Sequence, residues 1–557
     1  METAFEILNQ STQTPRTAGS TVTATELLRQ GKKKEIWEQY CGFLDLTTHG
    51  FMDLQRRLLA EQLPVLSASR LGAKLLRGET PKSIDEFRRT VPFTTYKDYA
   101  SHLLVKDESV LPEKPYAWVH TSGRSGEYDY KWVPYTRRMY ELGGDAGLAC
   151  LLLSAAKARG EVALREGMTF PYLIAPPPYV SGIFTQRVLE LFAFNTLPPL
   201  DKALTMDFQE RTQEALAGAL SEGLDFFFGV TSILIRISEQ FSRLGGGGGG
   251  AALKMLLKPK ALLRIARAFL KSRLMGRPLL PKDIWKVQGA MCGGMDTSIF
   301  KDKVVESWGL VPLEAYASTE FGVMATQTWS RNGLTFFPQC NLWEFILESD
   351  YRQLLEDPTF IPESHLMDEV KPNTEYVLAG TNLHGGALVR YIGGDFVKIT
   401  TLEDTEAGVR LPQMVFVSRI DDVIDVGSFT RLTEKTLWQA IENSGIPYED
   451  WSVRKEYHGE QPVLHAYIEL KEQSLEAEVV SERIRESLKK LDAPYRDLEE
   501  LTGLKPFSVT LLSKGTYRRY FEERQAAGAD LAHLKPPHVN ASDKMVENLM
   551  RMSSWKI

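Results

Sequence analysis

Short apolar runs alternate with helical patterns between residues 115 and 340. The runs are YAWVH, YKWVPYT, FPYLIAPPP, LDFFFGVTS, WKVQGAMCGG and PLEAYAS. Apolar runs of this length, separated by segments with apolar residues at helical spacing, are typical of strands that alternate with helices. The pattern therefore predicts an α/β core with ligand-binding loops at the ends of the strands.

Other patterns flank this core. Residues 22–77 carry apolar residues at helical spacing, and a further helix should begin after Ser83, its predicted N-cap, and end at Pro92. Strand signals become denser in the later part of the core, as in TEYVLAGTNLHGGALVRYIGGDFVKIT. They predict a β-rich subdomain near residues 335–418.

The last part of the chain predicts a separate, smaller domain. WSVRKEYHGEQPVLHAYIEL predicts two strands around a HGEQP turn, VSERIRESLKKL a helix and PFSVTLL another strand. Before them, RIDDVIDVG is short, charged and ends in glycine, as domain boundaries often do. A chain of 557 residues is also too long for one ordinary core. We therefore expect an N-terminal domain over 1–418, a hinge over 419–427 and a mobile α+β C-terminal domain over 428–557.

Composition narrows the class of protein. The chain is 43% hydrophobic and 25% charged, as soluble globular proteins are, and its net charge of -6 argues against nucleic acid as the main partner. No apolar run reaches the roughly 18 residues of a membrane span, and the N-terminus does not resemble a secretory signal. The four cysteines lack CxxC spacing, so we expect neither a disulfide framework nor a zinc site, and a cytoplasmic location.

Two features interrupt the pattern of the core. Gly245–Gly250 is a run of six glycines that predicts a mobile loop. The basic, amphipathic segment that follows, residues 254–277, could lie on an anionic membrane or cover a partner. The alternative, a solvated helix pair flanking the loop, is the interpretation that the sequence favours.

TSGRSG lies between two predicted strands and is a candidate phosphate-binding loop. Backbone N–H groups and hydroxyls in such a loop can bind an anion, and glycine permits close approach of the backbone. Lys131, which follows the loop, could add a positive charge. The alternative is a simple turn, and the loop is not a Walker A motif, which needs GxxxxGK followed by Ser or Thr. The candidate residues are Thr121, Ser122, Gly123, Arg124, Ser125 and Gly126.

Two later segments offer matching chemistry. In YASTEFG, Tyr316 can stack on a purine, Thr319 can bind a phosphate oxygen and Glu320 can hold Mg²⁺. In VRYIGGDF, Asp395 follows two glycines and can accept hydrogen bonds from both ribose hydroxyls. Each segment alone could equally be a turn with a structural carboxylate. His120 and His384 lie close to these loops in sequence, and for both we favour a structural role.

Three segments resemble, in order, the three motifs of the adenylate-forming (ANL) superfamily. They are TSGRSG followed by KWVP, then YASTE, then RYIGGD. The closer resemblance is to the acyl acid amido synthetases, the plant auxin- and jasmonate-conjugating type of the auxin-responsive promoter family. The tail GTYRRYFEERQAAGADLAHLKPPHV is also similar to the pattern of that family. The similarity covers roughly residues 80–550 and implies the adenylating-enzyme fold, with a large N-terminal adenylation domain and a small mobile C-terminal domain.

The resemblance implies an ATP-dependent ligase. A carboxylic acid would attack the α-phosphorus of ATP to give acyl-AMP and pyrophosphate, and an amine, usually an amino acid, would then displace AMP to form an amide. Lys535, Thr319 and Glu320 would be catalytic, with Glu320 holding Mg²⁺ and Arg419 near the ribose at the hinge. The other residues implied to bind ATP are Thr121, Ser122, Gly123, Arg124, Ser125, Gly126, Gly293, Gly294, Tyr316, Ala317, Ser318 and Asp395.

Departures from the family pattern leave alternatives open. Arg124 replaces a threonine of the first motif, Ile392 an arginine of the third, and His538 the arginine after the C-terminal lysine. One alternative is an acyl-CoA ligase of the phenylacetate type, against which the C-terminal pattern argues. Another is a non-catalytic nucleotide-binding protein recruited to membranes. FFFGVTS is equally consistent with a site for an apolar acyl group and with plain core packing. The sequence does not define the amine, and we expect a monomer.

Overall fold

The computed structural model divides the chain into two compact units. The first comprises Met1–Gly123, Glu127–Gly393 and Val397–Phe416, and the second Arg124–Gly126, Gly394–Phe396 and Val417–Ile557. The described part of the chain is residues 22–554 without 122–129, 245–258, 295, 358–359, 421–422, 427–429, 459–460, 473–474, 497–505 and 527–535. The glycine run Gly245–Gly250, the loop residues Ser122–Gly126 and Lys535 therefore lie outside the described residues.

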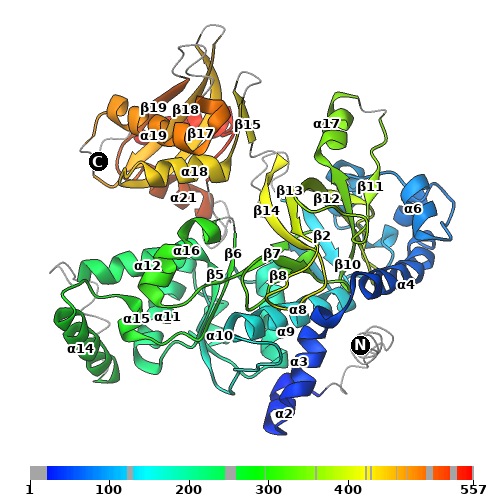
Figure 1. Ribbon diagram of the computed structural model, residues 1–557, viewed down its shortest axis with the longest axis horizontal. Coiled ribbons are helices and arrows are strands. Elements are labelled where there is room, and N and C mark those ends of the chain that lie inside the picture. The colour runs from blue at the N-terminus through cyan, green and yellow to red at the C-terminus, as the bar shows by residue number, and fades with distance from the viewer. Residues whose placement is uncertain are drawn as a thin grey trace. The chain divides into compact units, whose positions relative to one another are not determined.

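A large mixed sheet forms the centre of the first unit (Figure 1). Its strand order is β11-β10-β12-β13-β14-β9-β8-β7-β6-β5. The neighbours β5, β6 and β7 are parallel, whereas β7–β8, β8–β9, β9–β14, β10–β12 and β10–β11 are antiparallel. The strands are β5 (Phe226–Val230), β6 (Gly289–Gly293), β7 (Leu313–Ser318), β8 (Gly322–Gln327), β9 (Leu334–Phe336), β10 (Asn341–Leu347), β11 (Ser364–His365), β12 (Thr374–Asn382), β13 (Tyr391–Thr401) and β14 (Gln413–Arg419).

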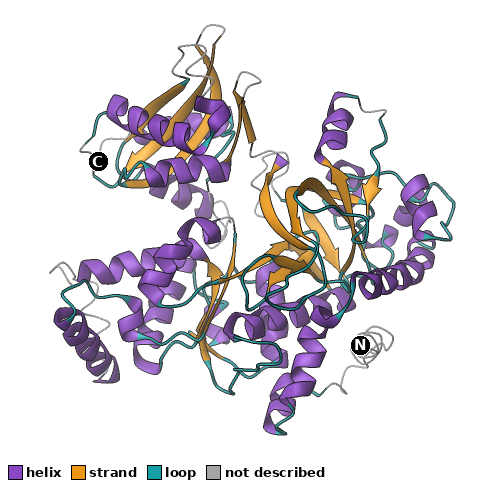
Figure 2. Ribbon diagram, in the orientation of Figure 1, coloured by secondary structure: helices purple, strands orange, loops and turns teal. Residues whose placement is uncertain are grey.

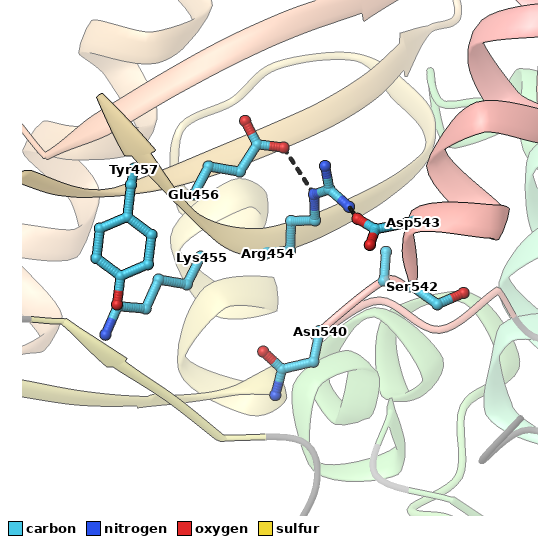
Figure 3. Close-up of a pocket in the computed structure, with 8 residues that line it drawn as sticks. Arg454, Lys455, Glu456, Tyr457, Asn540, Ser542 and Asp543 are labelled. Carbon is cyan, nitrogen blue, oxygen red and sulfur yellow. Dashed lines mark hydrogen bonds and ion pairs between the residues drawn. The ribbon is translucent and has the colours of Figure 1, made fainter. Parts of the chain in front are cut away.

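Helices and two small sheets complete this unit (Figure 2). The small sheets pair β1 (Ala117–His120) with β2 (Trp132–Tyr135) and β3 (Thr169–Pro171) with β4 (Asn195–Leu197). The helices are α2 (Ala24–Arg29), α3 (Lys33–Cys41), η1 (Gly42–Asp45), α4 (Thr48–Ser67), α5 (Arg70–Leu75), α6 (Ile84–Thr90), η2 (Tyr96–Asp98), α7 (Ala100–Leu103), η3 (Glu108–Val110), α8 (Arg137–Ala155), α9 (Val180–Leu191), α10 (Leu200–Ala203), α11 (Phe208–Glu222), α12 (Thr231–Leu244), α14 (Pro259–Leu274), α15 (Pro281–Ile284), α16 (Asp296–Trp308) and α17 (Glu348–Glu356).

Local sequence explains where these helices begin and how they pack. The Ser83 hydroxyl accepts a hydrogen bond from Glu86 N, so Ser83 is the N-cap of α6, as predicted, and the helix ends just before Pro92. Helix α8 is buried along almost its whole length. Its Gly143 faces the ring of Phe184 on α9, where an added Cβ would lie 2.1 Å from a ring carbon. Glycine is therefore needed for the close packing of α8 on α9.

The second unit is an α+β domain built on a three-stranded sheet, β17-β18-β19. Central strand β18 is buried on both faces, because Leu464, Ala466 and Ile468 alternate with the buried Tyr467. Helices α18 and α19 lie side by side, and α21 packs against α22 over Tyr467. The elements are β15 (Val423–Val426), β16 (Thr430–Thr433), α18 (Glu434–Asn443), β17 (Tyr448–His458), β18 (Gln461–Leu470), α19 (Ala477–Leu491), β19 (Phe507–Leu512), α21 (Thr516–Ala526) and α22 (Asp543–Ser553).

The observed elements confirm the predicted fold class. All six apolar runs of the core contain strands, and the HGEQP turn does join two strands, β17 and β18. The four cysteines are free. Within the described part of the chain, no helix is long and apolar enough to cross a membrane. The predicted hinge over 419–427 stays a prediction.

Candidate functional site

The first motif is the loop of the β1–β2 hairpin. The two strands pair up to His120 and Trp132, and Thr121 and Lys131 extend this pairing by one step. Thr121 N donates to Lys131 O at 3.1 Å, and Lys131 N donates to the Thr121 hydroxyl at 3.1 Å. Thr121 therefore closes the base of the loop. The structure does not describe the remaining candidates of this motif, Ser122, Gly123, Arg124, Ser125 and Gly126.

His120, the last residue of β1, is part of an aromatic cluster. Its Nδ1 lies 2.8 Å from the Thr121 carbonyl oxygen, and its ring contacts those of Tyr130, Trp132 and Tyr179. Burial lowers the pKa of His120 below its usual value, against the opposing effect of the hydrogen bond to Thr121. A neutral histidine that donates to a carbonyl fits the structural role favoured from the sequence.

Parallel strands bring the glycine pair and the second motif to one edge of the large sheet. Gly293, the last residue of β6, pairs with Val230 of β5 and with Ala315 of β7. The carboxyl ends of three neighbouring parallel strands therefore meet, which is where open α/β sheets bind ligands. Gly294 has a φ of 109°, a conformation that favours glycine.

The second motif forms the tight turn between β7 and β8. Ser318 pairs with Gly322, so that Thr319, Glu320 and Phe321 make the turn. The Ser318 hydroxyl accepts a hydrogen bond from Phe321 N at 3.1 Å, which gives this predicted ATP-binding residue a role within the turn itself. Ala317, the second-last residue of strand β7, is exposed.

Three buried side chains fix the backbone of this turn. The Tyr135 hydroxyl donates to Thr319 O at 3.0 Å. Asn382 Nδ2 donates to Glu320 O at 3.1 Å, and Asn341 Nδ2 donates to Phe321 O at 2.9 Å. Asn382 Nδ2 also lies 2.9 Å from Asn341 Oδ1. Every carbonyl of the turn thus has a side-chain donor, and the positions of Thr319 and Glu320 are set by residues from β2, β10 and β12.

None of these three residues was predicted from the sequence. The signal that could have found Asn341 and Asn382 is an asparagine at one end of a strand, in NLWEFIL and TEYVLAGTN. Tyr135 gives no such signal, since tyrosine is common in strands.

The environment of the turn is largely buried. Burial first, and then the charge of Glu320, raises the pKa of Tyr135 well above its usual value, so the Tyr135 hydroxyl remains a donor. Tyr316 is also buried, with its ring centroid 5.8 Å from that of Phe416. Glu320 supplies the carboxylate of this turn, and the residue is buried. Among the described residues, no group of three or more His, Cys, Asp or Glu side chains could hold a metal ion.

The third motif places Asp395 beside Arg419. Asp395 is buried, and its Oδ1 lies 3.5 Å from Arg419 Nε, so the structure brings together the two residues that were expected near the ribose. Gly394, just before Asp395, has a φ of 81°, which favours glycine.

Arg390, the arginine of the same motif, has a structural role. It is buried, and its Nε and Nη2 lie 3.1 and 2.8 Å from Glu344 Oε1, which is also buried. Its Nη1 donates to Arg88 O at 2.7 Å, and its guanidinium lies 3.8 Å from the ring centroid of Phe93. Arg390 therefore joins the start of β13, the strand that contains Asp395, to the end of α6 and the segment that follows it.

His384, the other histidine considered above, is also structural. Burial lowers its pKa to about 4, and its Nε2 lies 2.8 Å from Gln339 O. It is neutral near pH 7 and has the left-handed φ of 58°.

Lys535 itself lies outside the described residues, but the segment that follows it is held firmly in the second unit. His538 Nδ1 lies 2.8 Å from Glu434 Oε1, and His538 Nε2 lies 3.0 Å from Asp450 Oδ1. The imidazole stacks on Trp451, with centroids 4.3 Å apart and planes 8° apart. Burial disfavours the charged ring, but the two carboxylates outweigh it, and the pKa of His538 is raised.

The GTY part of the tail motif begins helix α21. The buried Glu469 carboxylate accepts hydrogen bonds from Gly515 N and, at 2.8 Å, from Tyr517 N. A carboxylate at these N–H groups caps the helix and interacts favourably with its dipole. Lys514, just before them, is exposed.

Part of the second unit is similar to a known protein-family domain. Residues 431–544 match the GH3 family C-terminal domain. No curated protein matches the sequence.

Solved structures share the fold of the whole chain. The AtGH3.15 acyl acid amido synthetase in complex with 2,4-DB is 17% identical, with a TM-score of 0.63 over 93% of this chain and 96% of that one. A 2-hydroxyisobutyryl-CoA ligase in the postadenylation state, in complex with R3-HIB-AMP, is 14% identical, with a TM-score of 0.56 over 98% and 97%. The chain therefore has the fold of adenylate-forming enzymes, and the predicted resemblance to the acyl acid amido synthetases is confirmed.

Proposed function

We propose that this chain, which carries a GH3 family C-terminal domain over residues 431–544, is an ATP-dependent acyl acid amido synthetase. Its substrates are a carboxylic acid and an amine, with an amino acid as the expected amine. The match of the C-terminal domain carries this choice, because the overall fold is shared with a CoA ligase and does not by itself distinguish an amide from a thioester product.

The first half-reaction joins the acid to the α-phosphate. A carboxylate oxygen of the acid attacks the α-phosphorus of ATP, the bond from phosphorus to the bridging oxygen breaks, and pyrophosphate leaves. Catalysis of this step rests on positioning and on stabilisation of charge. The turn between β7 and β8 suits this task, since Tyr135, Asn341 and Asn382 hold its backbone fixed.

Individual residues have the following proposed roles. Tyr316 packs against the adenine with Gly293 and Gly294, Thr319 binds the α-phosphate, and Asp395 accepts hydrogen bonds from the ribose with Arg419 beside it. Thr121–Gly126 contact the phosphates, and Lys535 stabilises the developing charge. Glu320 would hold Mg²⁺; a single carboxylate fits this ion, which usually keeps several waters and phosphate oxygens as its other ligands and neutralises phosphate charge.

In the second half-reaction the amine nitrogen attacks the acyl carbon. The bond from that carbon to the AMP oxygen breaks, AMP leaves, and the nitrogen loses a proton to solvent or base. Lysine suits the first half-reaction alone, because a point charge on a separate unit can be withdrawn before the amine enters. We expect this chemistry to take place in the cytoplasm, with the chain acting as a monomer.

Pyrophosphate release tests the proposal. The protein would be given ATP, Mg²⁺ and a panel of aryl, indolyl and fatty acids, with and without amino acids, and separately with coenzyme A. Acid-dependent release with an amide detected by mass spectrometry supports the synthetase. Release that requires coenzyme A assigns the chain to the thioester-forming ligases. ATP binding without release for any acid would support a non-catalytic protein.

A further inference from the structure

Helix α14 presents leucines to the solvent along one side. Leu262, Leu263, Leu270 and Leu274 are 47%, 53%, 62% and 81% exposed. Their spacing places them on one half of the helix surface, and the partly exposed Phe269 lies at the edge of that half. Single exposed apolar residues are ordinary in proteins, but several in one contiguous patch indicate a binding surface.

Contacts on the opposite side fix this orientation. Ala261, Ala268 and Ser272 are buried, and the two alanines belong to the apolar cluster of this part of the unit. Arg264 Nη1 donates to Ala219 O at 2.8 Å and to Leu220 O at 3.1 Å. These carbonyls lie in the last turn of α11, so Arg264 anchors this side of α14 to the C-terminal end of α11.

The charge around these leucines is positive. Residues 240–282 contain no Asp or Glu, in a chain whose net charge is -6. Lys271 and Arg277 are ion-paired with the buried Asp283, at 3.3 and 2.6 Å. Exposed basic residues nevertheless remain beside the leucines, namely Lys260, Arg267 and Arg273. The ten basic residues of this stretch are Arg243, Lys254, Lys258, Lys260, Arg264, Arg267, Lys271, Arg273, Arg277 and Lys282.

We propose that this side of α14 binds the surface of a membrane that contains anionic lipids. The leucines enter the boundary between headgroups and acyl chains while Lys260, Arg267 and Arg273 contact anionic headgroups, the arrangement of helices that lie in the membrane plane. We call this surface the α14 face; it consists of Lys260, Leu262, Leu263, Arg267, Leu270, Arg273 and Leu274.

Figure 1 shows α14 at the outer edge of the part of the first unit that also contains α11 and α15, so that a flat surface can approach it. The sequence alone favours a solvated helix pair here. The exposure of the leucines reverses that preference, because a solvated helix would carry polar residues on this side. The α14 face lies apart from the β7–β8 turn in sequence and uses none of the residues proposed to bind ATP, so the two proposals fail independently.

Vesicle co-sedimentation tests the α14 face with the full chain. We expect binding to vesicles of equal parts phosphatidylcholine and phosphatidylserine, weak binding to phosphatidylcholine alone, and loss of binding as salt rises. The variant Leu263→Ser/Leu270→Ser tests the apolar contribution and Arg267→Glu/Arg273→Glu the charge. Each should weaken binding by about tenfold or more. The control Val105→Ser/Leu355→Ser removes two apolar residues of the same unit that are at least as exposed as Leu263 and Leu270, and it should bind as the wild type does.

The same samples distinguish other occupants of the α14 face. A wild-type chain that fails to bind the anionic vesicles overturns the proposal. So does a solution mass by light scattering that falls to half in the leucine variant, because the face would then join two copies of the chain. Circular dichroism of each variant confirms that it is folded, since all four substituted residues are exposed and should leave the helix intact.

Discussion

The hydroxyl of Tyr135 donates a 3.0 Å hydrogen bond to the carbonyl oxygen of Thr319, 184 residues later in the chain. Tyr135 lies at the end of β2, the strand that leaves the TSGRSG loop, and Thr319 lies in the turn of the second motif. This bond connects the hairpin that carries the first motif to the turn that carries the second. Tyr135 is buried and Thr319 is half-buried.

Removing this hydroxyl should impair positioning more than substrate binding. Tyr135→Phe keeps the ring beside Phe184 but leaves the Thr319 carbonyl without its donor. We expect a loss of about 1 to 3 kcal/mol in the free energy of unfolding. The rate constant of ATP–pyrophosphate exchange should fall by about tenfold to a hundredfold, because a small displacement of Thr319 misplaces a reacting group.

Tyr376→Phe is the matched control for this prediction. Tyr376 is equally buried, and its hydroxyl accepts a hydrogen bond from Lys371 N at 2.9 Å. It lies near the beginning of β12, whereas Asn382 is the last residue of that strand. Urea unfolding should show that Tyr376→Phe loses about as much free energy of unfolding as Tyr135→Phe does. Its rate constant of ATP–pyrophosphate exchange should fall much less. Equal effects of the two variants on exchange would show that Tyr135 acts only through stability.

Breaking the Arg390–Glu344 pair should unfold the first unit more readily. Glu344→Gln leaves the buried guanidinium without its countercharge, and we expect a loss of about 3 to 5 kcal/mol in the free energy of unfolding. The double variant Glu344→Gln/Arg390→Met removes both charges and should be less destabilised than Arg390→Met alone. Denaturant titration of the four proteins measures the coupling, and additive losses would contradict a direct pair.

Much of this fold could be predicted from local pattern. The runs FFFGV and AYAS predict β5 and β7, because a short apolar run between helical segments indicates a strand without any knowledge of its tertiary contacts. The order of the motifs then indicates the superfamily. Arg390 was expected only as part of a motif, and its role depends on Glu344, a strand residue of ordinary appearance. The clamp on His538 likewise needs Glu434 and Asp450, which are 104 and 88 residues away. Such tertiary contacts leave no local signal.

The clamp on His538 should make the stability of the C-terminal unit fall as pH rises. Both ring nitrogens face carboxylates, so the charged imidazole is favoured, and the pKa of folded His538 lies above its unfolded value. Its contribution to stability is then complete below the unfolded pKa of about 6.5 and is lost as pH rises through the folded value. Thermal unfolding between about pH 5 and pH 9, a range that includes the unfolded pKa of about 6.5, measures how steeply stability falls with pH.

His538→Gln should remove this slope, since the amide does not titrate, while destabilising the unit at low pH. His49→Gln is the control, because His49 is an exposed residue of α4 in the other unit and pairs only with its helix neighbour Asp53 among the contacts described. If the slope survived in His538→Gln, another group would be its source.

Lys535 and Lys514 offer a test of which lysine of the second unit serves adenylation. Lys535 belongs to the tail pattern and precedes the segment that His538 holds in place. Lys514 comes directly before that pattern and is exposed just before the Glu469-capped helix α21. Lys535→Ala should lower the rate constant of acid-dependent ATP–pyrophosphate exchange by about a hundredfold to a thousandfold, the usual cost of removing one stabilising group from a transition state. Its effect on amide formation from supplied acyl-AMP should be much smaller, because that step makes no use of the lysine. Lys514→Ala should leave both rates unchanged, and the reverse pattern would transfer the role to Lys514.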